Sequence, residues 1–271
     1  SILEEILKDL QKIGATPILV GGCVRDYFLN IPVKDYDVEI FGIDCIQTIE
    51  KSLQKFGSVK LVGKSFGVLT LRVNKYDFDF ALPRTETKIG LSHQDFEVIT
   101  NASLSFKEAA IRRDFTINAI GYDFFKEEFI DPFDGIEDLK TKTIKHINDK
   151  TFIEDSLRVY RAVAFASRFN FKIEEKTKEL CKQIVLKNEL KYLPKERVYE
   201  EFKKLFLKSS KPSIGFELMR ELGILKYFSE LQALINCIQE PEYHPEGDVW
   251  VHTMMALDEM ARILKEENIE N

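Results

Sequence analysis

The sequence has few cysteines, few histidines, a single tryptophan and no long hydrophobic run. No apolar stretch approaches the roughly 18 residues of a membrane span, and the first residues lack a signal-peptide segment. We therefore expect a cytoplasmic protein without membrane association. The cysteines show no metal-ligand spacing, so we expect reduced thiols in the core. These are Cys23, Cys45, Cys181 and Cys237.

The chain has 271 residues, enough for two modest domains with hydrophobic cores of their own. Its net charge of −6 argues against a surface coated throughout by nucleic acid, although a local basic groove is compatible with it. Between residues 156 and 211, basic residues outnumber acidic ones about two to one. This excess fits a surface that follows an RNA backbone and fits an ordinary solvated helix face equally well.

The stretch 18–42 reads as strand, glycine turn, short helix, loop and second strand. An apolar run ends at Gly21 and Gly22, and a glycine pair lets the backbone turn sharply and approach a ligand closely. The helix that follows would point backbone N–H groups at an anion such as a triphosphate. A plain structural turn is the alternative interpretation of such a pair.

Two aspartates, Asp35 and Asp37, alternate with apolar residues in the second strand of this stretch. Because side chains alternate along a strand, both carboxylates should point the same way, and two adjacent carboxylates favour a divalent metal ion between them. We place Asp79, from a strand predicted at 76–82, beside them as a third carboxylate. A solvent-exposed strand edge is the alternative for each of these aspartates.

The motifs G-G-x-V-R-D (residues 21–26) and K-D-x-D-V (residues 34–38) together resemble the signature of the DNA polymerase beta-like nucleotidyltransferases. The similarity is to the class II bacterial tRNA CCA-adding enzymes and poly(A) polymerases. It implies an α/β (α+β) head with a mixed sheet at 1–148 and an all-α domain for nucleotide selection and RNA binding at 149–238. An incomplete HD-like helical region would occupy 239–271.

The resemblance implies that Mg²⁺ is held by Asp35 and Asp37, with Asp79 as a third catalytic residue. The triphosphate would be held by Gly21, Gly22 and Arg25. The motif R-R-D-x-x-x-N-A at 112–119 implies that Arg113 and Asp114 recognise ribose and phosphate while Asn118 holds the turn. The polar residues 84–95 lack periodicity and are interpreted as a flexible loop.

From about residue 149, apolar residues recur with a helical period. The predicted helices span residues 157–169, 176–186, 195–207, 212–222, 231–238 and 251–264. The segment 153–161 is also read as one helix, with Asp155, Arg158 and Arg161 on one side and Glu154 paired with Arg158. Stabilising ion pairs are the simple interpretation of this pattern.

The same segment resembles the family's E-D-x-x-R templating motif, in which protein side chains imitate a base-pairing partner. A carboxylate accepts from the amino group of cytosine or adenine, and an arginine donates to ring acceptors. Glu154 would orient Arg158, with Asp155 and Arg161 also at the base. The segment 193–197 (LPKER) resembles a later helix motif that braces this helix.

His244, Asp248 and His252 lie in a segment similar to the opening of an HD phosphohydrolase domain. The chain contains no His-Asp dipeptide, so we assign no metal to this incomplete set and infer that the chain is part of a longer protein. The predicted function is CCA addition to the tRNA 3′ end from CTP and ATP. The alternatives are a poly(A) polymerase, A-only or CC-only addition, a non-catalytic RNA-binding protein, and a full-length phosphohydrolase. The sequence indicates no oligomeric state.

Overall fold

The structure is a computed structural model, and it describes residues 1–62, 67–88 and 96–267. The chain divides into two compact units, which are described separately. Unit 1 comprises residues 1–141 and 146–151, and unit 2 comprises residues 142–145 and 152–271. Residues 239–267, which the sequence assigns to a third region, therefore lie in unit 2.

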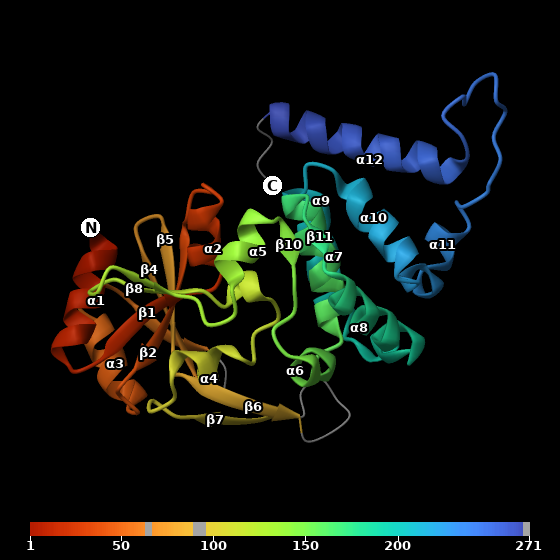
Figure 1. Cartoon of the computed structure of the whole chain (residues 1–271). Helices are drawn as coiled ribbons and strands as arrows, with labels where there is room; N and C mark the ends of the chain where they lie inside the picture. Colours follow the sequence, from red (N-terminus) through yellow and green to blue (C-terminus); the bar gives the residue numbers. More distant parts are fainter. Residues whose placement is uncertain (63–66, 89–95, 268–271) are drawn as a thin grey trace. The chain divides into compact units, whose positions relative to one another are not determined.

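Unit 1 combines helices with a mixed sheet (Figure 1). Its elements are α1 (Ile2–Lys12), β1 (Thr16–Val20), α2 (Gly22–Phe28), β2 (Asp35–Phe41), α3 (Ile46–Leu53), β3 (Val59–Val62), β4 (Val68–Val73), β5 (Tyr76–Ala81), β6 (Arg84–Lys88), β7 (Phe96–Thr100), α4 (Phe106–Ala110), a 3-10 turn (Thr116–Asn118), β8 (Gly121–Asp123), β9 (Glu128–Ile130) and α5 (Gly135–Lys140).

The seven-stranded sheet of unit 1 has the order β3-β4-β5-β2-β1-β8-β9. The central pair β2 and β5 is parallel, and the other neighbouring strands are antiparallel. The mixed sheet predicted for the head is thus confirmed. Since β2 and β5 are parallel and in register, two stretches about forty residues apart present matching positions side by side.

The two faces of this sheet differ in polarity because side chains alternate along each strand. Val38, Ile40, Phe78 and Phe80 point to one face and are buried. Residues of α1 and α2 line this apolar face, and α3 contacts α1. The intervening positions of β2 and β5 carry acidic side chains, so the opposite face is the polar one.

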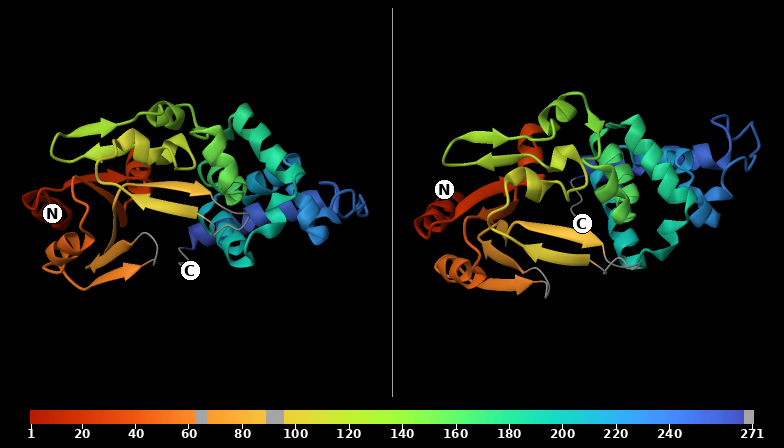
Figure 2. Two further views of the ribbon diagram at one scale, coloured as in Figure 1. Left: turned by 90° about the horizontal axis from the view of Figure 1, so that it is seen from below. Right: turned by 60° about the horizontal axis from the view of Figure 1, so that its bottom comes forward.

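The loop prediction for residues 84–95 is wrong in its first part. Residues 84–88 form strand β6, which pairs antiparallel with β7 in a separate two-stranded sheet (Figure 2). Thr85 and Thr87 are β-branched and favour an extended strand, a signal that does not depend on apolar periodicity. The rest of the predicted loop, residues 89–95, lies outside the described residues.

Unit 2 is mainly helical and includes one small parallel strand pair. Its elements are β10 (Thr143–Ile144), α7 (Leu157–Phe169), β11 (Lys172–Ile173), α8 (Glu175–Leu186), α9 (Lys195–Lys208), α10 (Pro212–Glu221), α11 (Ser229–Gln232), α12 (Val249–Glu266) and 3-10 turns at Glu189–Tyr192 and Ile224–Tyr227, while α6 (Asp149–Glu154) spans the division between the units. The helix predicted at 231–238 is wrong: α11 ends at Gln232, and hydrogen-bonded turns follow.

Helix α12 is fixed to α10 by polar contacts of a buried tryptophan in its first turn and of an aspartate in its middle. Trp250 is 1% exposed, and its indole N–H donates to Glu217 Oε1 at 2.5 Å. Asp258 accepts from the Ser213 backbone N–H at 3.0 Å and from its hydroxyl at 2.7 Å. An indole is buried favourably only when its N–H has such a partner.

Two of the four cysteines meet the expectation of core thiols. Cys23 and Cys181 are buried, and burial raises the pKa of both thiols, to about 11 and about 12. Cys45 and Cys237 are exposed, which corrects the prediction for them. Within the described ranges, every helix is too short or too polar to cross a membrane.

Gly135, the first residue of α5, leaves no room for a side chain. A Cβ atom there would lie 2.3 Å from the Thr116 carbonyl oxygen, which belongs to the backbone. We expect Gly135→Ala to lower the free energy of unfolding by about 1–3 kcal/mol, because backbone must move. Urea unfolding with an unchanged slope measures this. Gly57→Ala, which meets only the flexible end of Leu71 at 3.2 Å and the Arg72 carbonyl oxygen at 3.5 Å, is the control and should cost less.

Candidate active site

Three aspartates meet on the polar face of the sheet in unit 1. Asp35 and Asp37 occupy alternate positions of β2 and so point the same way, as the sequence predicts. Asp37 is paired in register with Asp79 of β5, and Asp35 with Asp77. Asp77 is exposed and lies 3.6 Å from Arg72 in an ion pair. The parallel strands therefore bring the D-x-D alternation of β2 beside the same alternation in β5.

The surroundings disfavour ionisation of two of these carboxyl groups. Both side chains remain accessible to solvent, but the protein atoms around them reduce their hydration and raise their pKa. Asp35 adds to the rise at Asp37, while Arg113 and Arg25 oppose it. At Asp79 the carboxylates of Asp37, Asp77 and Asp35 add to the rise.

Gly21 lies directly against this group. A Cβ atom there would lie 3.2 Å from both Asp37 Oδ2 and Arg113 Nη1, and its φ is +71°. Only glycine adopts this positive φ without strain, and only glycine leaves room for the Asp37 and Arg113 side chains to lie so close to the backbone. The backbone of Gly22 also hydrogen bonds to Asp37 and lowers its pKa. The glycine pair and the aspartate motif thus form one site, as their order in the sequence indicates.

Arg113 is held beside Asp37 by a buried acid that the sequence analysis missed. Glu39 is the third acidic residue on the polar side of β2, and its side chain is 2% exposed. Its carboxylate lies 3.2 Å from Arg112 Nη2 and 3.5 Å from Arg113 Nη2. The alternation D-x-D-x-E was the available signal. The buried end of this strand therefore neutralises an arginine pair, while its accessible end presents the carboxyl groups of Asp35 and Asp37.

Arg25, Asn118 and Asp114 form a second buried group. Arg25 Nη1 donates to Asn118 Oδ1 at 2.7 Å, and Asn118 Nδ2 donates to Asp114 Oδ1 at 2.9 Å. Arg25 also donates to Asp26, and its side chain is only 6% exposed. The same Asp114 oxygen accepts from the Phe115 backbone N–H at 2.8 Å. The two predicted motifs, 93 residues apart, are joined by these bonds.

The single helix predicted over residues 153–161 is wrong. Helix α6 ends at Glu154 and α7 begins at Leu157. Asp155 lies between them, and its carboxylate accepts from the Leu157 backbone N–H at 3.1 Å. Aspartate side chains compete in this way for backbone donors and favour helix starts over helix interiors.

Asp155 is also paired with a residue from another helix of unit 2. Arg197, in the segment 193–197 noted for its bracing role, donates to Asp155 Oδ2 at 2.9 Å. Arg158 and Arg161 stay three residues apart on α7, and Arg161 Nη1 lies 3.7 Å from Glu201 of α9. The structure thus ties the start of α7 to α9.

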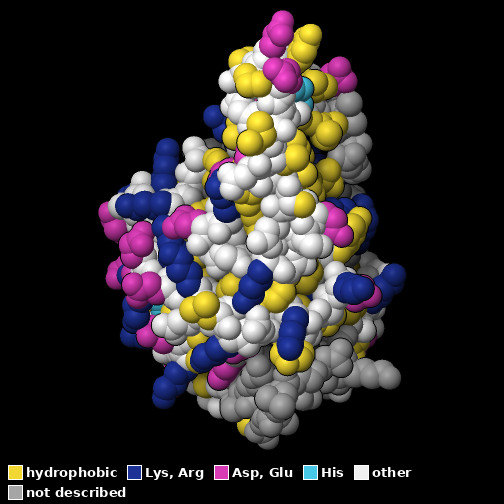
Figure 3. Space-filling view, turned by 90° about the vertical axis from the view of Figure 1, so that its right-hand side faces the viewer, with side chains coloured by type: hydrophobic (Ala, Val, Ile, Leu, Met, Phe, Trp, Pro, Cys, Tyr) yellow, Lys and Arg dark blue, Asp and Glu magenta, His cyan; other side chains and the backbone are white. Residues whose placement is uncertain are grey.

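Basic side chains form no single continuous patch on the face drawn in Figure 3. Lys and Arg side chains (dark blue) lie at many separate places on the described part of that face, between acidic and hydrophobic ones. This distribution does not distinguish the two interpretations of the basic excess at residues 156–211, a surface that follows an RNA backbone and a solvated helix face.

The raised pKa of Asp79 predicts a dependence of stability on pH. A carboxyl whose folded pKa exceeds its unfolded value favours the folded state at low pH and loses that contribution as pH rises through the folded pKa. We expect Asp79→Asn, measured in chelator, to raise the free energy of unfolding at pH 7 by about 0.5 kcal/mol. The gain should vanish near pH 3.

Asp9→Asn is the matched control with the opposite sign. Lys55 and Ser52 hydrogen bond to Asp9 and lower its pKa. Its replacement should therefore destabilise the protein at pH 7, with the difference lost on acidification. A gain for Asp79→Asn that is equal at pH 3 and pH 7 would contradict an electrostatic origin.

The arrangement in unit 1 matches the needs of nucleotidyl transfer. Adjacent carboxylates that repel each other are suited to a divalent cation, and a glycine turn beside an arginine lets phosphate oxygens approach. The donors are carboxylate oxygens, the ligand type that Mg²⁺ prefers.

Comparisons with known protein families point the same way. Residues 18–145 match the family model described as the poly A polymerase head domain. Residues 170–235 match the model described as the probable RNA and SrmB-binding site of polymerase A. The two models together cover most of the chain: the first includes almost all of the seven-stranded sheet, and the second lies within unit 2.

Among curated proteins, the chain is 40% identical over 256 residues to a multifunctional CCA protein of Mannheimia succiniciproducens. The match covers 93% of this chain and 58% of that protein. A multifunctional CCA protein of Pseudoalteromonas atlantica is 39% identical over 249 residues, with 90% of this chain and 59% of that protein covered. The chain thus spans less than three fifths of the length of these relatives.

Among solved structures, a CCA-adding enzyme with CTP matches with a TM-score of 0.70 and 28% identity, covering 84% of this chain and 53% of that one. A tRNA nucleotidyltransferase complexed with a primer tRNA and an incoming ATP analog matches with a TM-score of 0.67 and 31% identity. That match covers 88% of this chain and 64% of the other.

Proposed function

Since this chain belongs to the family of poly(A) polymerases and class II tRNA CCA-adding enzymes, we propose that it adds C and A from CTP and ATP to the 3′ end of tRNA. The observation that carries the proposal is the group formed by Asp35, Asp37 and Asp79 beside Gly21. The relatives named as multifunctional CCA proteins support this substrate, and from the tRNA-processing role we also propose a cytoplasmic location.

The residues present fit a bound Mg²⁺. Asp35 and Asp37 would be its ligands, with Asp79 as a third, since their mutual repulsion is relieved by a cation. A metal ion bound there would supply Lewis-acid chemistry, which favours loss of the proton from the RNA 3′-hydroxyl and offsets negative charge at the α-phosphate.

The remaining residues of unit 1 would hold the nucleotide in place. Gly21 and Gly22 let phosphate oxygens approach the backbone, and Arg113 supplies positive charge next to Asp37. We assign Arg25, Asp114 and Asn118 to the nucleotide site through their hydrogen-bonded group, which fixes the turn after Arg113. Because Arg25 is buried in that group, its contribution to triphosphate binding is mainly to position the turn.

In unit 2, we propose that Glu154, Asp155, Arg158 and Arg161 select the base. Carboxylate acceptors and arginine donors match the edges of cytosine and adenine, and a wrong base would leave buried polar groups unpaired. The bond from Arg197 to Asp155 supports a fixed position for the start of α7. Arg161, which lies beside Glu201, would also hold α7 to α9.

The test is incorporation of labelled nucleotide into tRNA that lacks its terminal CCA, with Mg²⁺ and with CTP and ATP supplied separately and together. We expect C addition from CTP alone and complete CCA when both are present. Long runs of A from ATP alone would indicate a poly(A) polymerase. Tight tRNA binding without incorporation, and with nucleotide affinity independent of Mg²⁺, would indicate a non-catalytic RNA-binding protein.

A further inference from the structure

A pocket of about 330 Å³ lies on the apolar face of the unit 1 sheet, opposite the aspartates. This volume is in the range of small-molecule sites. Leu19 of β1 pairs with Tyr122 of β8, and Tyr122 pairs with Phe129 of β9, so these three side chains point to one face and line the pocket. Tyr36 of β2 lines it as well, and residues of α1 and α2 close the other side. The sheet and two helices thus enclose a space with an apolar floor.

Aromatic rings form a large part of the wall of this pocket. Tyr27 of α2, Tyr36, Tyr122 and Phe129 all line it. The ring centroid of Phe129 lies 4.9 Å from that of Tyr122 and 6.0 Å from that of Tyr27. Tyr27 is 64% exposed and Phe129 is 40% exposed, so both rings keep surface that a ligand can cover. The face of an aromatic ring attracts a cation, and the pocket wall therefore favours a ligand of positive charge.

Among the described residues that line the pocket, Glu127 is the charged one. It lies in the turn between β8 and β9, with a φ of +55°. Asp123 accepts from the backbone N–H groups of Phe125 and Lys126 at 3.1 and 3.2 Å, and its other carboxylate oxygen lies 3.5 Å from Lys126 Nζ. Asp123 therefore fixes the turn and engages its lysine, while Glu127 forms no hydrogen bond or ion pair with any described residue.

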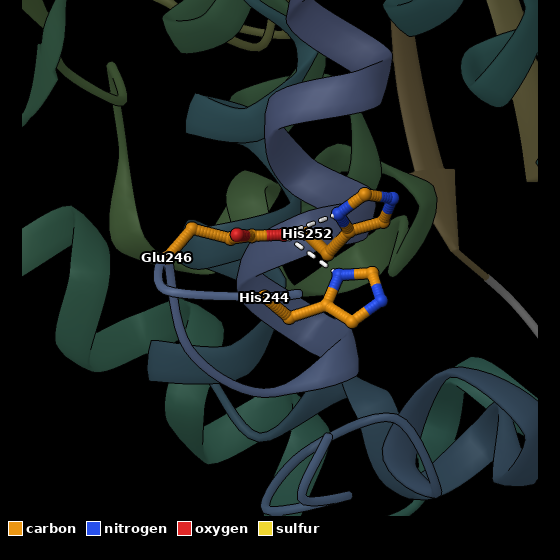
Figure 4. Close-up of side chains that lie close together, drawn as sticks. All are labelled: His244, Glu246 and His252. Carbon is orange, nitrogen blue, oxygen red and sulfur yellow. Dashed lines mark hydrogen bonds and ion pairs between the residues drawn. The ribbon is translucent and has the colours of Figure 1, made fainter. Parts of the chain in front are cut away.

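Glu246 of unit 2 shows the contrasting case of a carboxylate with cationic partners inside the chain. Its side chain lies within hydrogen-bond distance of both His244 and His252 (Figure 4). Glu127 has no such partner in the described part of the chain, so its negative charge is available to a ligand in the pocket.

We propose that this pocket binds a small organic cation that carries a flat apolar ring. The ring would cover the apolar floor around Leu19, and the cationic group would lie beside the aromatic rings and near Glu127. Rings and a carboxylate together favour a cation over a neutral or anionic molecule of the same shape. The proposal does not depend on the nucleotidyltransferase function.

The pocket and the aspartates lie on opposite faces of the same strands. Tyr36 lies between Asp35 and Asp37 in β2, and its side chain points away from theirs because side chains alternate along a strand. Cys23 and Val24, which also line the pocket, directly follow the glycine pair. A ligand in the pocket would therefore contact the helix and strand of the candidate active site without touching its carboxyl groups.

The experiment is a titration of the ¹⁵N-labelled chain, followed by its amide NMR signals, with three compounds that share an indole ring. Tryptamine is a cation, indole-3-ethanol is neutral and indole-3-acetate is an anion. We expect tryptamine to shift the signals of residues that line the pocket, such as Tyr122 and Phe129, and to bind at least about tenfold more tightly than indole-3-acetate. Glu127→Gln should lower the affinity for tryptamine to about that for indole-3-ethanol.

Two further variants separate the charge of Glu127 from the shape of the pocket. Glu128→Gln removes an equal charge from the neighbouring residue, whose side chain points to the other face of β9, and should bind tryptamine as the unaltered chain does. Phe129→Ala should weaken tryptamine and indole-3-ethanol alike, by about five- to tenfold, because both lose a wall of the pocket. Tyr27→Ala, which changes an exposed side chain, serves in its place if Phe129→Ala does not fold.

Three results would overturn the proposal: no binding of tryptamine at millimolar concentration, equal affinities for the three compounds, or an affinity for tryptamine unchanged by Glu127→Gln. Binding that is lost in Asp37→Asn and kept in Glu127→Gln would place the cation at the aspartates instead.

Discussion

Asp37→Asn is expected to reduce nucleotide incorporation by about 10³-fold or more. The amide keeps the size of the side chain but removes the charge that would hold a divalent cation, a loss of several kcal/mol in transition-state stabilisation. Gly21, Gly22 and Arg113 all lie against Asp37, which connects the aspartates to the glycine turn. Single-turnover incorporation of labelled CTP measures the effect.

Asp77→Asn is the control for this prediction. Asp77 lies on the same face of the sheet, two residues from Asp79, but it is exposed and paired with Arg72. Its replacement should change incorporation by less than about threefold, as expected for an exposed ion pair. Mg²⁺ should raise the melting temperature of the unaltered chain more than that of Asp37→Asn. Equal activity of the two variants would contradict the assignment of Asp37.

Glu39→Gln is expected to lower the free energy of unfolding by about 2–3 kcal/mol, because it leaves two largely buried arginines without their shared countercharge. The loss stays below that for a fully buried pair since Arg112 and Arg113 are 16% and 17% exposed. The control is Glu137→Gln, whose ion pair with Lys140 is on the surface. It should cost at most about 1 kcal/mol.

Glu39→Gln should also shift the pH profile of incorporation, which a purely structural loss would leave in place. Arg113 lowers the pKa of Asp37, and Glu39 holds Arg113 where it does so. If Arg113 moves away, the pKa of Asp37 rises further, and the acid limb of the profile moves to higher pH. An unchanged acid limb in a folded variant would limit Glu39 to a structural role.

The parts that could be predicted from the sequence are those set by short-range patterns. The alternation of polar and apolar residues in β2 predicts that Asp35 and Asp37 lie on one face. The same alternation at residues 76–82 predicts the strand that carries Asp79. The sequence Ser-x-x-Glu at residues 105–108 is another local pattern, and the capping box that it favours is present at the start of α4.

The parts that could not be predicted depend on partners far away in the chain. The pairing of Glu39 with Arg112 and Arg113 spans more than seventy residues, so no local pattern shows that these charges neutralise each other. The break between α6 and α7 arises because Asp155 bonds to backbone and to Arg197 rather than continuing a helix. Helical periodicity alone does not reveal this competition.

The place of β2 and β5 within the sheet has a consequence for hydrogen exchange. Each of these strands has a neighbour on both sides, so neither can fray from an edge. Amides in β2 should therefore exchange with solvent only through global opening, at the slowest rates in unit 1. Asp35, Asp37 and Asp79 therefore lie on the strands of unit 1 that are least able to separate from their neighbours. Their carboxyl groups stay close together for as long as unit 1 is folded.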